Sequence, residues 1–457
     1  MSFTSTSPKL CSPYFNNPTL RNFEPRVGVA WDPFGNGKTA VRAAFGIFDV
    51  LPLIYEFSGA IGTSAPFTEK VAATGTPGSF PTGIVSTIFG SGPPPPTSLR
   101  FGSIQVNPPR NYLMLWNLNV QRELTPSTTF MIGYVGNHGV HMLNRADDVN
   151  MVIPQATPQG LLWPFPAGSG TILNPVIGDI RGEYWTGTSL YDALELQLTR
   201  RMSHGFHVQA SYTWGKNIDT GSASVIGDPF TNSITSPLWF CSACRRGLSD
   251  FNIAQTLVVN YVWDVPTPEN WGAVASHLLG GWQLRGIVTV ETGVPFTPLI
   301  GGDPLGENST DPFAYPGRVA GPGCGSPLNP GNPSNYIKLQ CFTVPMASPS
   351  IAALCTPFNN VPGSCENLFG NVGRNSVIGP GLATWDFSVV KNTHINERFN
   401  VQFRAELFNI LNKANFGTPV DNSTFFDSGG NPVGGAGALD TTSTTSRQVQ
   451  LGLKVIF

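Results

Sequence analysis

Residues 399–407 read FNVQFRAEL, and this stretch decides the class of secondary structure. Phe399, Val401, Phe403 and Leu407 alternate with polar residues, so apolar and polar side chains fall on opposite faces of an extended chain. A helix with 3.6 residues per turn would scatter the same apolar residues around its axis. The period of two therefore predicts a strand with one apolar and one polar face.

The same alternation recurs outward from this stretch along the chain. Many of the segments that show it are about 8–12 residues long, whereas strands of globular sheets usually have about 5–6 residues. A strand that crosses a membrane at a tilt needs about 9–11 residues. The eleven predicted strands are 25–31, 39–48, 112–122, 129–136, 191–200, 205–214, 254–264, 282–292, 384–392, 399–411 and 446–457.

Short and long connections alternate between these predicted strands. This order places all short connections at one end of an antiparallel sheet and all long ones at the other, as in outer-membrane barrels with short periplasmic turns and long extracellular loops. A sandwich has no reason to sort its loops in this way, and the 40–45-residue period of a propeller is not seen. The short turns are 32–38, 123–128, 201–204 and 393–398, the intermediate connection is 265–281, and the long ones are 49–111, 137–190, 215–253, 293–383 and 412–445.

The two faces of the strands carry different residues. Tryptophans near strand ends predict the aromatic girdles of a membrane barrel, although tryptophan is also a common strand residue in general. A cation facing hydrocarbon costs about 2–4 kcal/mol at the midplane, so the charged face is predicted to line a wet lumen. The girdle tryptophans are Trp31, Trp116, Trp214, Trp263 and Trp282, and the lumen candidates are Arg26, Arg42, Glu195, Arg285, Glu291, Arg404, Glu406 and Lys454.

Composition excludes several other classes of protein. The 26 Lys and Arg nearly balance the 28 Asp and Glu, so the chain lacks the basic surplus of a nucleic-acid binder. Hydrophobic residues reach 40%, too many for a disordered chain. No run of 18 apolar residues predicts a transmembrane helix, and residues 1–10 do not read as a signal peptide. An all-β chain fits best, and the plain alternative to a membrane barrel is a soluble one.

Six of the seven cysteines fall in predicted loops, namely Cys241, Cys244, Cys324, Cys341, Cys355 and Cys365. Cysteines clustered in Pro- and Gly-rich loops suggest local disulfides in an oxidising compartment. Sequence proximity favours pairing of Cys324 with Cys341 and of Cys355 with Cys365, although spacing alone does not determine the pairing. The CxxC at Cys241 could instead be half of a zinc site, but no second ligand pair of suitable spacing follows.

No motif predicts an enzyme or a cofactor. Gly37-Lys38-Thr39 resembles the end of a phosphate-binding loop, but the position that needs its first glycine holds Asp32 and a strand follows where a helix is required. The HxxH pairs at His138 and His204 lie near strand ends, where residues three apart face opposite sides of a strand. The GxSxG elbow of serine hydrolases is absent from the sequence.

Several segments together resemble TonB-dependent outer-membrane receptors. Residues 403–419, FRAELFNILNKANFGTP, resemble the signature of their penultimate strand. Residues 370–392, GNVGRNSVIGPGLATWDFSVVKN, and 191–219 resemble the Oar-like branch of that family, as do NFEPRVGVAW at 22–31 and GVPFT at 293–297. The resemblance covers nearly all of residues 1–457, which we interpret as one receptor-like β-barrel domain.

The resemblance implies a bacterial outer-membrane barrel of 22 strands, closed by an N-terminal plug that TonB pulls from the periplasm. It also implies that Phe457 is read by the outer-membrane assembly machinery. A final strand that ends in the periplasm would put every long loop outside the cell. Family members take up metal chelates, cobalamin, sugars and peptides, and no residue here selects among these substrates.

The sequence also departs from the family pattern, since no plug, TonB box or signal peptide is recognisable. Counting back from a 22nd strand makes the eleven predicted strands the C-terminal half of the barrel. An open half-barrel would expose two edge strands to lipid, which lipid does not tolerate. We therefore expect the chain to be a fragment of a longer protein that supplies the remaining strands, the plug and the contact with TonB.

The sequence thus predicts the barrel wall and ligand-capturing loops of an energised transporter for a small molecule or peptide. The predicted ligand loops are 49–111, 137–190, 215–253 and 293–383, whose aromatic residues would either stack on a ligand or pack the loops themselves. These residues are Trp163, Phe165, Trp185, Trp239 and Phe240. The alternatives are a non-energised porin or adhesin, and a secreted all-β binding protein or glycosidase.

Overall fold

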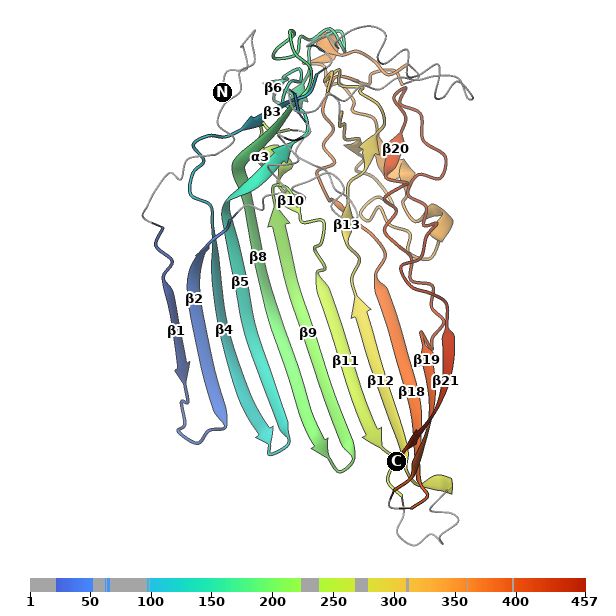
Figure 1. Ribbon diagram of the computed structural model, residues 1–457. Helices are drawn as coiled ribbons and strands as arrows, with labels where there is room; N and C mark the ends of the chain where they lie inside the picture. The colour runs from blue at the N-terminus through green and yellow to red at the C-terminus, as the bar shows by residue number, and fades with distance from the viewer. Residues whose placement is uncertain are drawn as a thin grey trace.

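A computed structural model describes residues 22–51, 62, 64–65, 97, 99–222, 238–267, 278–309, 312–359, 361–396 and 398–457. These residues form one large curved sheet, with a folded mass of loops at one end that we call the loop body (Figure 1). Most of the predicted loop 49–111 and part of 215–253 lie outside the described residues.

Eleven strands of the described residues follow one another in the sheet in chain order, each antiparallel to the next. All eleven predicted strands are thereby confirmed, and we call this part the wall. Its strands are β1 (Arg26–Trp31), β2 (Thr39–Asp49), β4 (Tyr112–Thr125), β5 (Thr128–Ala146), β8 (Ile180–Ser203), β9 (Phe206–Asp219), β11 (Gln255–Asp264), β12 (Trp282–Glu291), β18 (Leu382–His394), β19 (Asn400–Phe408) and β21 (Gln448–Ile456).

Two wall strands are much longer than predicted. β5 continues to Ala146 and β8 begins at Ile180, so both extend from the wall into the loop body (Figure 1). The predicted loop 137–190 is wrong at both of its ends for this reason. The alternation ends in these extensions because both faces are covered: Ala146, Tyr184 and Trp185 are all buried there, and so is the charged Arg145.

The short turns lie together at the end of the wall opposite the loop body, as predicted (Figure 1). One of them joins β8 to β9 by a two-residue turn, since Ser203 pairs with Phe206 and only His204 and Gly205 lie between them. Both of these residues have positive φ, 52° and 72°. Two left-handed residues give the hairpin turn whose twist matches that of the flanking strands.

The loop body is built from short elements that join distant parts of the chain. Most of its strands pair in twos, for example β13 with β17 and β14 with β20, whereas β3 and β10 pair with the wall strands β8 and β9. The elements outside the wall are β3 (Phe101–Ile104), β6 (Gln155–Thr157), β7 (Gly160–Leu162), α3 (Ser242–Arg245), β10 (Gly247–Leu248), β13 (Pro295–Phe296), β14 (Leu299–Ile300), β15 (Gly317–Arg318), η2 (Pro333–Asn335), η3 (Leu339–Cys341), β16 (Phe342–Thr343), η4 (Ala352–Leu354), β17 (Val377–Ile378) and β20 (Thr424–Phe426).

The main hydrophobic core lies in the loop body and not in the wall. Its fully buried members include Trp163, Phe296, Ile337 and Phe425, which come from three separate connections between wall strands. The loop body also contains three disulfides, Cys241–Cys244, Cys324–Cys341 and Cys355–Cys365. The last two are the pairs that sequence proximity favours.

Candidate functional site

The strand register divides the wall into two chemically distinct faces. Residues directly opposite each other on antiparallel strands share a face, and Phe403 lies opposite Leu453 on β21. Following such pairs from strand to strand shows that one face is apolar from β1 to β21. It carries Val29, Leu118, Leu196, Val259, Val288, Phe387, Phe403 and Leu453.

Many residues of this apolar face are exposed and are not packed against other parts of the protein. On strands inside the wall, Leu118 is 48% exposed, Ile132 43% and Trp214 58%. A continuous apolar surface of this extent is unusual on a protein surrounded by water and marks a site of contact with another apolar phase. The arrangement suits strands whose outer face lies in hydrocarbon.

The opposite face carries all eight residues that were proposed to line a lumen. Their register positions place Arg26, Arg42, Glu195, Arg285, Glu291, Arg404, Glu406 and Lys454 together on it. Hydrogen bonds run along and across the strands on this face. Arg404 Nε donates to Gln402 Oε1 at 2.6 Å, and Gln402 Nε2 donates to Asn392 Oδ1 at 2.8 Å. Arg42 Nη1 donates to Gln121 Oε1 at 2.9 Å.

At its turn end the apolar face also carries three cations, which we call the basal cations. Each lies over an aromatic ring: Arg122 over Phe34 at 5.4 Å, Arg200 over Phe206 at 5.9 Å and Lys391 over Trp282 at 5.8 Å from the ring centroid. Each also bonds to an acceptor near a turn, such as the Gly280 carbonyl that accepts from Lys391 Nζ. Long basic side chains take such positions where an apolar surface meets water.

The girdle tryptophans all lie on the apolar face. Trp31, Trp263 and Trp282 stand at its turn end, and Trp116 and Trp214 stand closer to the loop body. Phe206, opposite Trp263, and Trp214 are eight residues apart on β9, which is about 27 Å of strand at a rise of about 3.4 Å per residue. At a tilt near 40° this gives a height of roughly 20 Å, similar to the apolar band of about 25 Å in outer-membrane barrels.

A buried polar cluster joins the wall to the loop body, and we call it the junction cluster. Arg374, which is 6% exposed, donates from Nη2 to Asp219 at the end of β9 and forms a second ion pair with Asp250 at 3.4 Å. Its Nε donates to the Arg245 carbonyl at 3.0 Å. Asn375 Nδ2 donates to Asp250 as well. One arginine thus contacts Asp219, Arg245 and Asp250, each of which lies more than 100 residues before it in the sequence.

Burial raises the pKa of Asp250 to about 6, and the nearby Asp219 carboxylate acts in the same direction. The hydrogen bond from Asn375 and the positive charge of Arg374 act in the opposite direction but do not cancel the effect of burial. No sequence pattern pointed to Arg374, Asp219 or Asp250, because their meeting depends on tertiary contacts between distant segments.

The aromatic residues proposed to contact a ligand divide into three groups by their burial. Trp163 and Trp185 are each only 1% exposed, and Trp163 Nε1 donates to the Val152 carbonyl at 2.9 Å. Trp239 is half-buried and stacks on Tyr184 with a centroid distance of 6.3 Å, and the half-buried Phe240 meets Trp239 edge to face. Phe165 is 52% exposed. Packing within the loops therefore occupies Trp163 and Trp185, which leaves Phe165 as the accessible member.

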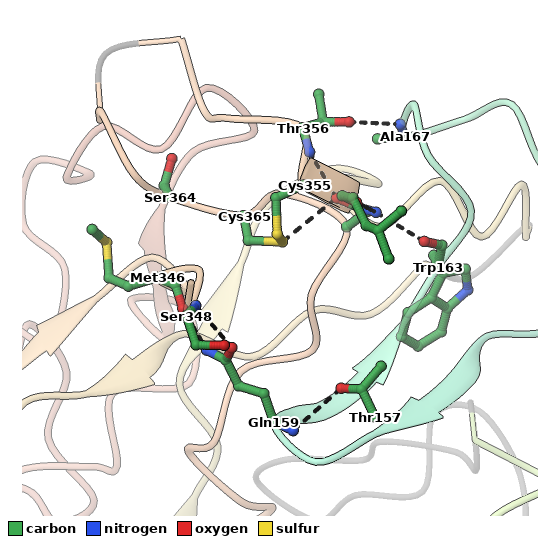
Figure 2. Close-up of a disulfide and its surroundings, with 12 residues drawn as sticks. Thr157, Gln159, Trp163, Ala167, Met346, Ser348, Cys355, Thr356, Ser364 and Cys365 are labelled. Carbon is green, nitrogen blue, oxygen red and sulfur yellow. Dashed lines mark hydrogen bonds between the residues drawn. A yellow bond between two sulfur atoms is a disulfide. The ribbon is translucent and has the colours of Figure 1, made fainter. Parts of the chain in front are cut away.

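The loop body is further held by bonds between two predicted ligand loops, as Figure 2 shows around the Cys355–Cys365 disulfide. Gln159 Nε2 donates to the Met346 carbonyl at 2.6 Å, and the Ser348 N–H donates back to Gln159 Oε1 at 2.9 Å. The Ala167 N–H donates to Thr356 Oγ1 at 2.8 Å. Loops 137–190 and 293–383 therefore form one packed unit.

Among the described residues, no three His, Cys, Asp or Glu side chains lie close enough together to hold a metal ion.

In the part of the chain that the structure describes, no helix has the length and apolar character needed to cross a membrane.

Comparison with protein families gives one match, a family described as the outer membrane beta barrel domain, over residues 5–450. No curated protein matches the sequence significantly. Among solved structures, the chain is similar to the outer membrane transporter YddB from Escherichia coli, with 11% identity and a TM-score of 0.43, over 94% of this chain and 39% of that one.

Two further solved structures are similar to this chain with comparable identity, TM-score and coverage. The FrpB iron transporter from Neisseria meningitidis has 10% identity and a TM-score of 0.39, over 94% of this chain and 38% of that one. The ferric enterobactin receptor PfeA from Pseudomonas aeruginosa has 9% identity and a TM-score of 0.40, over 95% and 40%. The chain thus spans about two fifths of the length of these structures.

Proposed function

The chain belongs to the family of outer membrane beta barrel domains, and from this membership we propose that it forms the wall and the ligand-capturing loops of a TonB-dependent transporter. The outer membrane is its location, as the family implies. The observation that carries the proposal is the register of the wall, which separates a continuous apolar face from a charged one while the loop body stands at one end. A catalytic role is not part of the proposal.

The open sheet supports a half-barrel within a larger closed one. Among the described residues, β1 and β21 each pair with one neighbour only, so one edge of each strand carries no strand partner. Unpaired backbone groups are costly in hydrocarbon, which holds no water to bond with them. We propose that further strands of a longer protein complete a barrel of 22 strands, in which this chain supplies strands 12–22.

Energised uptake rests on the sequence resemblance. The penultimate-strand signature at 403–419 and the Oar-like segments at 191–219 and 370–392 support membership of that branch of TonB-dependent receptors. We propose that the plug and the contact with TonB belong to the part of the protein that completes the barrel. The barrel-assembly machinery would read Phe457, which directly follows β21.

The substrate path would run along the charged face of the wall. Arg42, Arg285, Arg404 and Glu406 would then line a wet lumen, where charges and amides cost little, and outer-membrane lipid would cover Val259 and Leu453. The loop body would capture a small molecule or peptide at the mouth, with Phe165 as its exposed aromatic contact.

Lipid contact is tested by fluorescence quenching. Single cysteines at Val259 and Asn260, neighbours on β11 that face opposite sides, would carry a fluorophore in protein reconstituted with brominated lipids. The background would replace the native cysteine at position 11, which lies outside the described residues, with serine. We expect strong quenching at position 259 and weak quenching at 260. Equal quenching at both positions would contradict the wall assignment and favour a soluble all-β protein.

Energisation is tested separately with the product of the whole gene. We expect a purified periplasmic domain of TonB to crosslink to it, and planar bilayers that contain it to show no permanent conductance. Permanent ion conductance without TonB crosslinking would identify a non-energised porin instead. Absence of both signals, together with binding to extracellular matrix, would identify an adhesin.

A further inference from the structure

The three disulfides of the loop body differ in their access to solvent. Cys341 and Cys365 are fully buried and Cys355 is 8% exposed, so each of the two longer-range bridges has at least one sulfur in the core. Cys241 and Cys244, by contrast, are both half-exposed, and the two residues between them on α3 are exposed. Cys324 is half-exposed as well, so Cys241–Cys244 is the bridge of these three in which neither cysteine is buried. An external thiol can therefore approach it at either residue, whereas each of the other two bridges has at least one buried cysteine.

The Cys241–Cys244 bridge also stabilises the fold the least of the three. It closes a loop between residues only three apart, whereas the other two span 17 and 10 residues. In the chain-entropy description, a shorter loop removes less freedom from the unfolded chain, so this bridge contributes the least stabilisation. The fold therefore opposes its opening less than it opposes opening of the other two.

The local bonding sets the direction in which the bridge opens. The Cys244 backbone N–H donates to Cys241 Sγ at 3.3 Å. Such a bond stabilises negative charge on that sulfur. Since the better-stabilised thiolate leaves faster in thiol–disulfide exchange, Cys241 is the leaving sulfur and Cys244 the sulfur under attack.

We propose that Cys241–Cys244 is a thiol-exchange site for low-molecular-weight thiols, which goes beyond the proposed transport function and does not depend on it. An external thiolate attacks Cys244 Sγ and forms a mixed disulfide there, while the electron pair of the broken S–S bond passes to Cys241 Sγ. A second external thiolate attacks the external sulfur of this mixed disulfide. The products are two cysteines of the protein in reduced form and one disulfide between two external thiols, with the thiol protons transferred to the cysteines.

Thiol exchange at this site would loosen the junction cluster. The residue after Cys244 is Arg245, whose carbonyl accepts from Arg374 Nε. Opening the bridge frees the short turn that holds this carbonyl in place. We expect the segment around Arg374 to become more accessible to protease once the bridge is open.

The test is graded reduction of the purified full chain in detergent micelles by glutathione, in a Cys11→Ser background. Free thiols are alkylated at intervals and located by mass spectrometry. We expect Cys241 and Cys244 to be alkylated at least about tenfold faster than the four other cysteines, because reaction rates follow the access of the thiol to the disulfide. A glutathione adduct should be trapped on Cys244, and the C241S/C244S double variant should show neither signal.

Two results would overturn the proposal. One is reduction of Cys355–Cys365 or Cys324–Cys341 at the same rate as Cys241–Cys244, which would mean that opening of the whole loop body governs all three. The other is resistance of Cys241–Cys244 to glutathione while the protein stays folded. Single variants test the direction separately: the lone Cys241 of C244S should react faster with iodoacetamide at neutral pH than the lone Cys244 of C241S.

Discussion

The wall and the loop body place apolar side chains in opposite ways. In the wall, Leu451 and Leu453 are mostly exposed and the charged residues face the other side of the sheet. In the loop body, Phe296 and Phe425 are fully buried in a core of the kind found in soluble proteins. One chain therefore contains two packing regimes, each suited to its own surroundings: the wall to hydrocarbon, and the loop body to water.

The junction cluster lies where these two regimes meet. The extensions of β5 and β8 run through this boundary, and Arg374 adds a charged contact there with Asp219 and Asp250. A charged contact holds one defined geometry, since its hydrogen bonds are directional. The comparison therefore locates the sites where substitutions should separate the two regions.

The largest effect is expected from Arg374→Met, which keeps much of the side-chain volume but removes the charge. Two buried carboxylates lose their partner, and breaking a buried ion pair in this way costs about 3–5 kcal/mol. Hydrogen exchange should show faster opening of the loop body while the wall strands stay protected. As the control, Arg404→Met on the half-buried charged face of the wall should leave exchange in the loop body unchanged.

Phe296→Ala should destabilise the loop body by about 3–5 kcal/mol, because a cavity remains in a packed core. Phe403→Ala is its matched control in the wall, since lipid can fill the space that this exposed side chain leaves. Limited proteolysis of the loops measures the stability of the loop body, and thermal melting of the reconstituted protein measures the stability of the wall. Equal sensitivity of both regions to these truncations would contradict the division into two packing regimes.

Val259→Arg should cost about 2–4 kcal/mol in a bilayer, the range for a cation near the midplane of a lipid-facing strand. Asn260→Arg, one residue along β11 and on the opposite face, should cost close to nothing. Folding titrations into lipid vesicles compare the two variants. A larger loss for the second variant would reverse the assignment of the two faces.

The smallest effect concerns pH. The pKa of Asp250 is raised to about 6 in the fold, so between its unfolded and folded pKa the native state binds more protons than the unfolded state. The stability of the loop body should therefore rise by about 1 kcal/mol as the pH falls from 7 to 5. Hydrogen exchange near Asn375 measures it, and Asp250→Asn should abolish this dependence. A loop body that becomes less stable as the pH falls from 7 to 5 would contradict a raised pKa of Asp250 in the fold.

The wall could be predicted from the sequence because its signal is local. Alternation at 399–407 and at 205–214 follows directly from a strand that lies between two different media, and the sorting of connection lengths gives the order of strands. The ends of β5 and β8 were missed because the alternation stops where loops cover both faces. Residues such as Arg145 and Asp147, buried as an ion pair, then resemble ordinary loop residues in the sequence.

The loop body could not be predicted because its contacts are not local. Trp163 lies in a core with residues from the 293–383 connection, and its neighbours in the sequence do not reveal this. The junction cluster likewise joins Asp219 at the end of β9 and Asp250 in the connection that follows to Arg374 in the 293–383 connection. Disulfides between cysteines 10 or 17 residues apart are the exception, since proximity in the sequence already favours them.

The basal cations have a consequence for how the protein sits in its membrane. Arg122, Arg200 and Lys391 all lie at the turn end of the apolar face, each with a ring and an acceptor to hold it there. Sliding the sheet toward the loop-body side would draw these charges into the bilayer, and sliding it the other way would pull the aromatic residues of that end out into water. The three side chains thus fix the depth at which the sheet is inserted in the bilayer, without the help of a ligand or partner.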